Sequence, residues 1–140
     1  MSACEINLGK NKDSYGGPRD ARPRVRNSPE WNYRQAFSVW RINHETMVEQ
    51  LEQATVRRNN LMIMKAAEDA GTALATMMAF LPEGKAKELE PMIDEYFGVG
   101  KKAMEGVNSH ILVSKLRTHR RVVTGGFDPD IVPIVAPREE

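Results

Sequence analysis

The sequence lacks the features that mark secreted, disulfide-bonded or membrane-spanning proteins. It contains a single cysteine, so no internal disulfide can form and a reducing compartment suits it best. No apolar run approaches the roughly 18 residues that a membrane-spanning helix needs, and residues 1–17 contain no apolar stretch like that of a signal peptide. We therefore expect no membrane partner. The expected location is the cytoplasm, or a virion or another assembly built inside the cell.

Aromatic residues are also scarce, at 6% of 140 residues, whereas there are eight methionines. This balance suits helix packing better than a β-sandwich, which draws on Val, Ile, Tyr and Phe. A chain of this length forms one domain with a modest core. The sequence predicts an all-α protein in three parts: a flexible basic arm at 1–27, a helical oligomerisation core at 28–122 and an extended Pro-rich tail at 123–140.

The net charge of +1 conceals two basic segments on either side of an acidic middle. Residues 1–29 carry six basic and three acidic side chains, and residues 110–125 carry four basic side chains and no acid. Residues 30–109 carry 9 basic and 12 acidic side chains. Because Arg and Lys bind phosphate, both basic segments are candidate nucleic-acid-binding sites. The candidate residues are Arg19, Arg22, Arg24, Arg26, Lys115, Arg117, Arg120 and Arg121.

The N-terminal basic segment contains glycine and proline but no periodic apolar face, which is typical of an arm. In an extended conformation Arg22, Arg24 and Arg26 would lie on one side of it. A protein partner or a neighbouring subunit remains an alternative to nucleic acid for this arm. The second basic segment lies near an expected helix C-terminus, where cations are stabilised by the helix dipole without any partner.

A helix is predicted to begin at Ser28, a good N-cap, followed by Pro29 and Glu30. Apolar residues then recur at spacings of three and four, the pattern of a coiled-coil seam. The phase is lost around residues 57–60 and then resumes. His44 falls in this seam, where a polar residue can fix register or oligomer state. The predicted oligomer interface consists of Phe37, Trp40, His44, Met47, Leu51, Met62, Ala73 and Met77.

Two arrangements of residues 28–81 fit this pattern. One is a long helix, bent where the phase is lost, and the other is a long helical hairpin that turns at Asn59 and Asn60. We favour the long helix, because neither glycine nor proline stands at the junction. A helix of about 50 residues cannot cover its seam within so small a chain. The sequence therefore predicts a homo-oligomer.

The remaining core is predicted to hold a short helix from Pro91 to Phe97, a weak point at Gly98 and Gly100, and a C-terminal helix from about Lys101 to Val122. Residues 127–137 are apolar and punctuated by proline. We expect this strip to dock on a neighbouring subunit or to form a short edge strand.

No catalytic, cofactor or metal site is recognisable. His44, His110 and His119 are far apart in the sequence and share no metal-ligand spacing. The segment from Gly98 to Lys102 lacks the upstream glycine, the following Ser or Thr and the preceding strand of a phosphate-binding loop. We therefore expect no catalytic residues, no cofactor and no enzymatic activity.

The expected function is that of a non-enzymatic homo-oligomer that binds DNA or RNA through phosphates, without sequence choice. By architecture alone, a small helical protein with basic arms is similar to virion structural proteins and to the small packaging subunits of bacterial viruses. The alternative is a structural or adaptor protein whose arm and tail wrap neighbouring subunits of a larger assembly, without binding nucleic acid.

Overall fold

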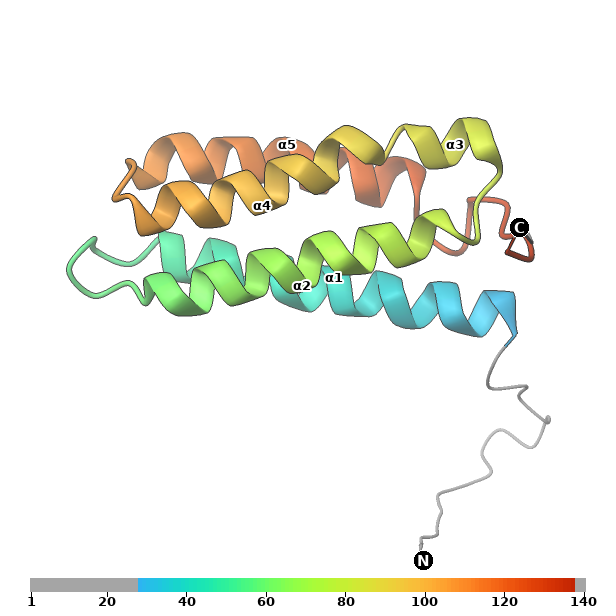
Figure 1. Cartoon of the computed structure of the whole chain (residues 1–140), viewed down its shortest axis with the longest axis horizontal. Coiled ribbons are helices and arrows are strands. Elements are labelled where there is room, and N and C mark those ends of the chain that lie inside the picture. Colours follow the sequence, from blue (N-terminus) through green and yellow to red (C-terminus); the bar gives the residue numbers. More distant parts are fainter. Residues whose placement is uncertain (1–27, 138–140) are drawn as a thin grey trace, which may run out of the picture.

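A computed structural model describes residues 28–137. Within them the chain is all-α, with helices α1 (Pro29–Leu51), α2 (Asn60–Met78), α3 (Glu83–Lys87), α4 (Glu90–Met104) and α5 (Ser109–Gly126). The four long helices run antiparallel to their sequence neighbours, with α1 and α2 in one layer and α4 and α5 in the other (Figure 1). Helix α2 packs against both α1 and α4, and α5 contacts α1 and α4. The predicted arm, with Arg19, Arg22, Arg24 and Arg26, lies outside the described residues. No helix among those described is long and apolar enough to cross a membrane.

Helix α1 begins where the sequence predicted, because the Ser28 hydroxyl accepts a hydrogen bond from the Trp31 amide at 3.1 Å. The favoured continuous helix is wrong, and the hairpin alternative is the observed one. Helix α1 ends at Leu51, and Asn59 caps α2 by accepting from the Met62 amide at 3.0 Å. An asparagine cap therefore starts the second helix without any glycine or proline at the turn.

Arg58 ties this turn to the rest of the bundle. Its side chain is 7% exposed and donates hydrogen bonds to Asn60 Oδ1 at 2.7 Å and to Ser109 Oγ at 2.6 Å. It also donates to the carbonyl oxygens of Ala103 at 3.1 Å and Val107 at 3.3 Å. The residues that interrupt the apolar period thus fasten the α1–α2 loop to the turn between α4 and α5.

The predicted seam is the core of the chain's own bundle. Trp40 and Met47 are 0% exposed and Leu51 is 1% exposed, because α2 and α5 pack against α1 and Tyr96 of α4 bonds Trp40. The seam therefore needs no second copy to bury it, which removes the reason for which it was assigned to an oligomer interface. Met62 was predicted to be the first buried residue of the second helix, but it is 43% exposed and its neighbour Ile63 is buried instead. The other predicted interface residues, Phe37, His44, Ala73 and Met77, are buried within the same chain.

Small residues allow α2 to approach its neighbours closely. A Cβ added at Gly100 of α4 would lie 2.9 Å from Ala67 Cβ and 3.3 Å from Met64 Cα, so only glycine fits there without displacing a helix. Helix α4 therefore continues through Gly98 and Gly100, which corrects the predicted weak point. The chain breaks instead after Met104, where Gly106 adopts a φ of +84°.

The C-terminal helix starts at Ser109 rather than near Lys101 and runs past the predicted boundary to Gly126. The following strip contacts its own bundle, and no strand forms within residues 28–137. Phe127 is 1% exposed, and its carbonyl accepts a hydrogen bond from the Tyr33 hydroxyl at 2.6 Å. The Val135 amide donates to the Phe80 carbonyl at 2.8 Å.

Candidate functional site

A chain of buried hydrogen bonds joins α1 to α4. Trp40 Nε1 donates to the Tyr96 hydroxyl at 2.8 Å, and that hydroxyl lies 2.6 Å from His44 Nδ1. The indole nitrogen can only donate, so the Tyr96 oxygen accepts from it and its own proton is directed to His44. Nδ1 of His44 is then the acceptor, and the neutral imidazole carries its proton on Nε2.

The surroundings of His44 keep it neutral. Burial, and after it the neighbouring Arg120 and His119, lower its pKa to about 4. Burial also raises the pKa of Tyr96 above its ordinary value. The Tyr96 ring lies 5.9 Å from that of His44 and 5.0 Å from that of His119, centroid to centroid. At neutral pH the network is therefore uncharged between His44 and Tyr96.

His119 completes this cluster from α5. It is 3% exposed, and its Nε2 hydrogen-bonds the Glu95 carboxylate of α4. Its Nδ1 is buried, and no hydrogen-bond partner for it occurs within the part of the chain that the structure describes. Sequence reasoning treated the histidines as unrelated, yet the rings of His44 and His119 both contact the ring of Tyr96. Nothing in the spacing along one chain shows such a meeting of three helices.

A groove of about 550 Å³ opens between α1 and α5, and we call it the α1/α5 groove. Arg117 Nη2 lies 3.6 Å from Glu52 Oε2, and Arg120 Nη1 lies 3.8 Å from Glu45 Oε2. Both separations exceed an ordinary hydrogen bond, so the guanidinium groups keep free donors. The lining carries three carboxylates and two guanidinium groups, for a net charge of −1. Its residues are Ile42, His44, Glu45, Thr46, Val48, Glu49, Glu52, Arg117 and Arg120.

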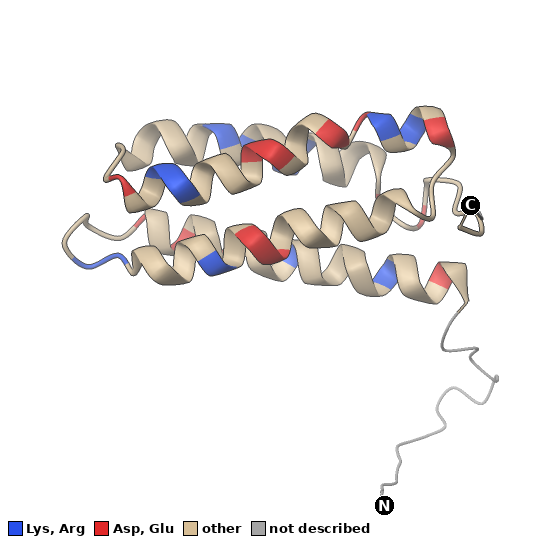
Figure 2. Ribbon diagram, in the orientation of Figure 1, with Lys and Arg blue, Asp and Glu red and all other residues tan. Residues whose placement is uncertain are grey.

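The four predicted phosphate-binding residues of α5 do not form one basic patch. Arg117 and Arg120 face carboxylates at the C-terminal end of α1, whereas Lys115 and Arg121 have no carboxylate partner among residues 28–137. Figure 2 shows acidic and basic residues interspersed along the helices. The helix dipole does not explain these cations either, because α5 continues to Gly126 and its last turn holds no basic residue.

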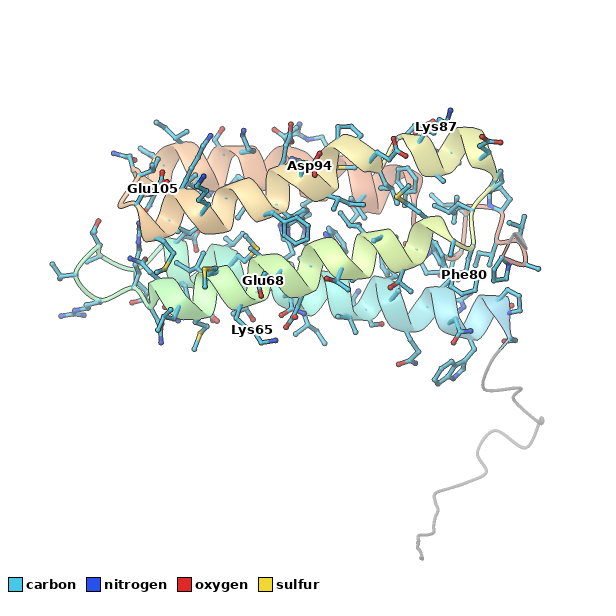
Figure 3. The ribbon with its side chains drawn as sticks, viewed as in Figure 1. Lys65, Glu68, Phe80, Lys87, Asp94 and Glu105 are labelled. Carbon is cyan, nitrogen blue, oxygen red and sulfur yellow. The ribbon has the colours of Figure 1, made fainter. Side chains whose placement is uncertain are left out.

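An apolar groove of about 480 Å³ lies between α2 and α4, and we call it the α2/α4 groove. Phe97 is 41% exposed and Met104 is 44% exposed, and both line it. The Phe97 ring lies over Gly71, where an added Cβ would be 2.8 Å from the ring. Glu68, labelled on α2 in Figure 3, and Lys101 place charges of opposite sign at the groove. Met64 and Ala67 complete its lining.

The described helices bring together no group of three or more His, Cys, Asp or Glu side chains that could hold a metal ion. Sequence reasoning also missed Tyr96, Glu95 and Phe97, because each becomes distinctive only through residues on another helix. Comparisons with protein-family models, curated proteins and solved structures find no match for this chain.

Proposed function

We propose that this protein is a non-catalytic helical bundle that self-associates through the α2/α4 groove, as a component of a larger assembly. The observation that carries the proposal is Phe97, whose ring is 41% exposed although it is packed against a glycine. Met104 lines the same groove and is 44% exposed. Apolar side chains of this size on a shared face are typical of protein interfaces.

The charges at this groove favour a second copy as its occupant. Glu68 and Lys101 carry opposite charges, and neither forms an ion pair with any residue from 28 to 137. In a two-fold symmetric interface the same patch meets itself, so Glu68 of one copy can face Lys101 of the other. The predicted self-association then uses this groove in place of the buried seam.

Light scattering after gel filtration tests the proposal, with the 15.8 kDa chain as the reference mass. The wild type is expected at twice that mass or more, and Phe97→Glu at the mass of one chain, because the new carboxylate would be buried without a partner. Ile111→Glu is the matched control, since Ile111 is 62% exposed on α5 and lies outside both grooves. A wild type that elutes as a single chain at about 100 µM, a concentration that should populate a specific dimer, overturns the proposal.

A charge exchange makes the test specific for a second copy. Glu68→Lys alone places like charges opposite each other and is expected to weaken association, as is Lys101→Glu alone. The double variant with both changes restores opposite charges across the two-fold axis and is expected to recover it. Failure of the double variant to recover would point to a different partner.

Binding of nucleic acid without sequence choice is the second candidate. Arg121 supports it, because this exposed side chain has no carboxylate partner among the described residues, and the sequence adds Arg22, Arg24 and Arg26. Mobility-shift titrations of duplex DNA and single-stranded RNA over a range of salt test it. For duplex DNA, each lost phosphate contact should reduce the slope of the logarithm of the binding constant against the logarithm of the salt concentration by about 0.9. If neither nucleic acid shifts at low salt, this candidate is rejected.

A further inference from the structure

The α1/α5 groove has the size and lining of a small-molecule site. Its volume of about 550 Å³ lies within the range of ligand pockets. Val48 and Ile42 contribute apolar surface, and polar groups come from both helices. This groove is separate from the α2/α4 groove through which we propose self-association.

His44, a largely buried side chain, supplies a hydrogen-bond donor to this groove. The imidazole is 2% exposed, lines the groove and turns its Nδ1 toward Tyr96. Its Nε2 points away from Tyr96 and carries the proton that the hydrogen-bond chain from Trp40 assigns to it. No residue among those described accepts a hydrogen bond from this nitrogen. Among the described residues only His119 Nδ1 is a fully buried side-chain polar atom without a partner, so His44 Nε2 is open to the groove, where an acceptor on a ligand can meet it.

Both signs of charge surround this donor. Arg120 and Arg117 are held only loosely, at 3.8 and 3.6 Å from their carboxylates, and can turn a guanidinium fork toward a ligand carboxylate. Glu49 lines the groove as well, and no cation within residues 28–137 pairs with it. One carboxylate therefore remains available for a positive group.

We propose that the α1/α5 groove binds a small zwitterion, an amino acid or a short peptide, with its carboxylate on Arg120 and His44 Nε2–H and its ammonium group on Glu49. A ligand with only negative charge would face the surplus of glutamates that gives the lining its net charge of −1. A ligand with only positive charge would leave the His44 donor unpaired. A zwitterion satisfies both ends of the site.

The test follows the His44 imidazole nitrogens by ¹⁵N NMR of the full chain. The probes are the dipeptide leucyl-alanine, its N-acetylated form, its C-terminal amide and inorganic phosphate. The free dipeptide is expected to shift the Nε2 resonance saturably at millimolar concentration. Each blocked form, which lacks one charge, is expected to bind about tenfold more weakly, as is usual for the loss of one charged hydrogen bond.

Matched variants locate the two ends of the site. Glu49→Gln keeps the size of the side chain and removes its charge, and Arg120→Gln removes the guanidinium group; each should weaken dipeptide binding by about tenfold. Arg121→Gln removes a cation from the same helix outside the groove and should leave binding unchanged. Absence of a shift at about 10 mM dipeptide overturns the proposal. Equal binding of the blocked forms, or a comparable shift with phosphate alone, overturns it as well. The native mass of the same samples reports self-association independently.

Discussion

The burial of His44 should make the stability of this fold depend on pH within a defined window. The folded imidazole has a pKa lowered from 6.5 to about 4, and it is only 2% exposed. In the unfolded chain it titrates near its ordinary value. Between pH 6.5 and about 4 the unfolded chain binds a proton that the folded chain does not, so acid favours unfolding. Above this window the imidazole is neutral in both states, and below it the loss is complete.

The size of the effect follows from the shift. A difference of about 2.5 pKa units corresponds to about 3 kcal/mol of unfolding free energy, of which about 2 kcal/mol is lost by pH 5. This is a large share of the 5–15 kcal/mol typical of a folded domain. With a urea m-value of about 1.5 kcal/mol/M, the unfolding midpoint should fall by about 1 M between pH 7 and pH 5.

Urea unfolding followed by circular dichroism at pH 7, 6 and 5 measures this loss. The comparison protein is His44→Gln, whose amide oxygen can still accept from Tyr96 but does not titrate. It is expected to be less stable than the wild type at pH 7, yet to lose about 2 kcal/mol less on going to pH 5. Contributions that are common to both proteins cancel in the difference. Equal losses in the two proteins would refute the reasoning.

Three further predictions concern packing and hydrogen bonds, and thermal and urea unfolding measure all of them. Gly98→Ala, with nothing within 4 Å of its added Cβ, should stabilise α4 by up to about 1 kcal/mol. Gly100→Ala should instead cost about 1–3 kcal/mol, because the added Cβ forces α4 away from α2. If Gly100→Ala were the more stable of the two variants, the close approach of α2 and α4 would be contradicted. Tyr96→Phe leaves the Trp40 indole N–H buried without an acceptor and should cost about 1–3 kcal/mol, so a neutral outcome would argue against the network. Arg58→Lys should cost about 2 kcal/mol and speed amide hydrogen exchange in the α1–α2 loop, because one ammonium group cannot reach all four acceptors. Unchanged exchange would show that Arg58 does not fasten this loop to the bundle.

The helical class and the start of α1 could be predicted because local chemistry decides them. Ser28 caps α1 through its own hydroxyl, and the apolar period identified Trp40 and Met47 as buried. Periodicity shows that one face of a helix is covered, but not which chain covers it. The expectation of an oligomeric seam failed at this step, because α2 turns back and covers the same face within one chain.

Turns were harder to predict because glycine and asparagine have more than one use. Asn59 starts α2 by capping it, although only glycine or proline was expected to mark such a boundary. Gly100 stands inside α4, where its missing side chain admits Ala67 of α2. A sequence read one helix at a time cannot distinguish a glycine that breaks a helix from one that lets two helices touch.

Charge was misjudged for a related reason. A sum along the chain treats residues 110–125 as strongly basic, whereas a surface combines the charges of adjacent helices. Arg117 projects toward Glu52, the C-cap residue of α1, and Arg120 projects toward Glu45 of α1, so the side of α5 that faces α1 is mixed rather than basic. Because long-range attraction of a polyanion depends on the combined field and not on single cations, α5 alone is a weak candidate for holding a phosphate backbone. The side of α5 that faces α1 therefore suits a ligand that carries both charges, which leaves Arg121 and the arginines of the N-terminal segment as the candidates for phosphate contacts.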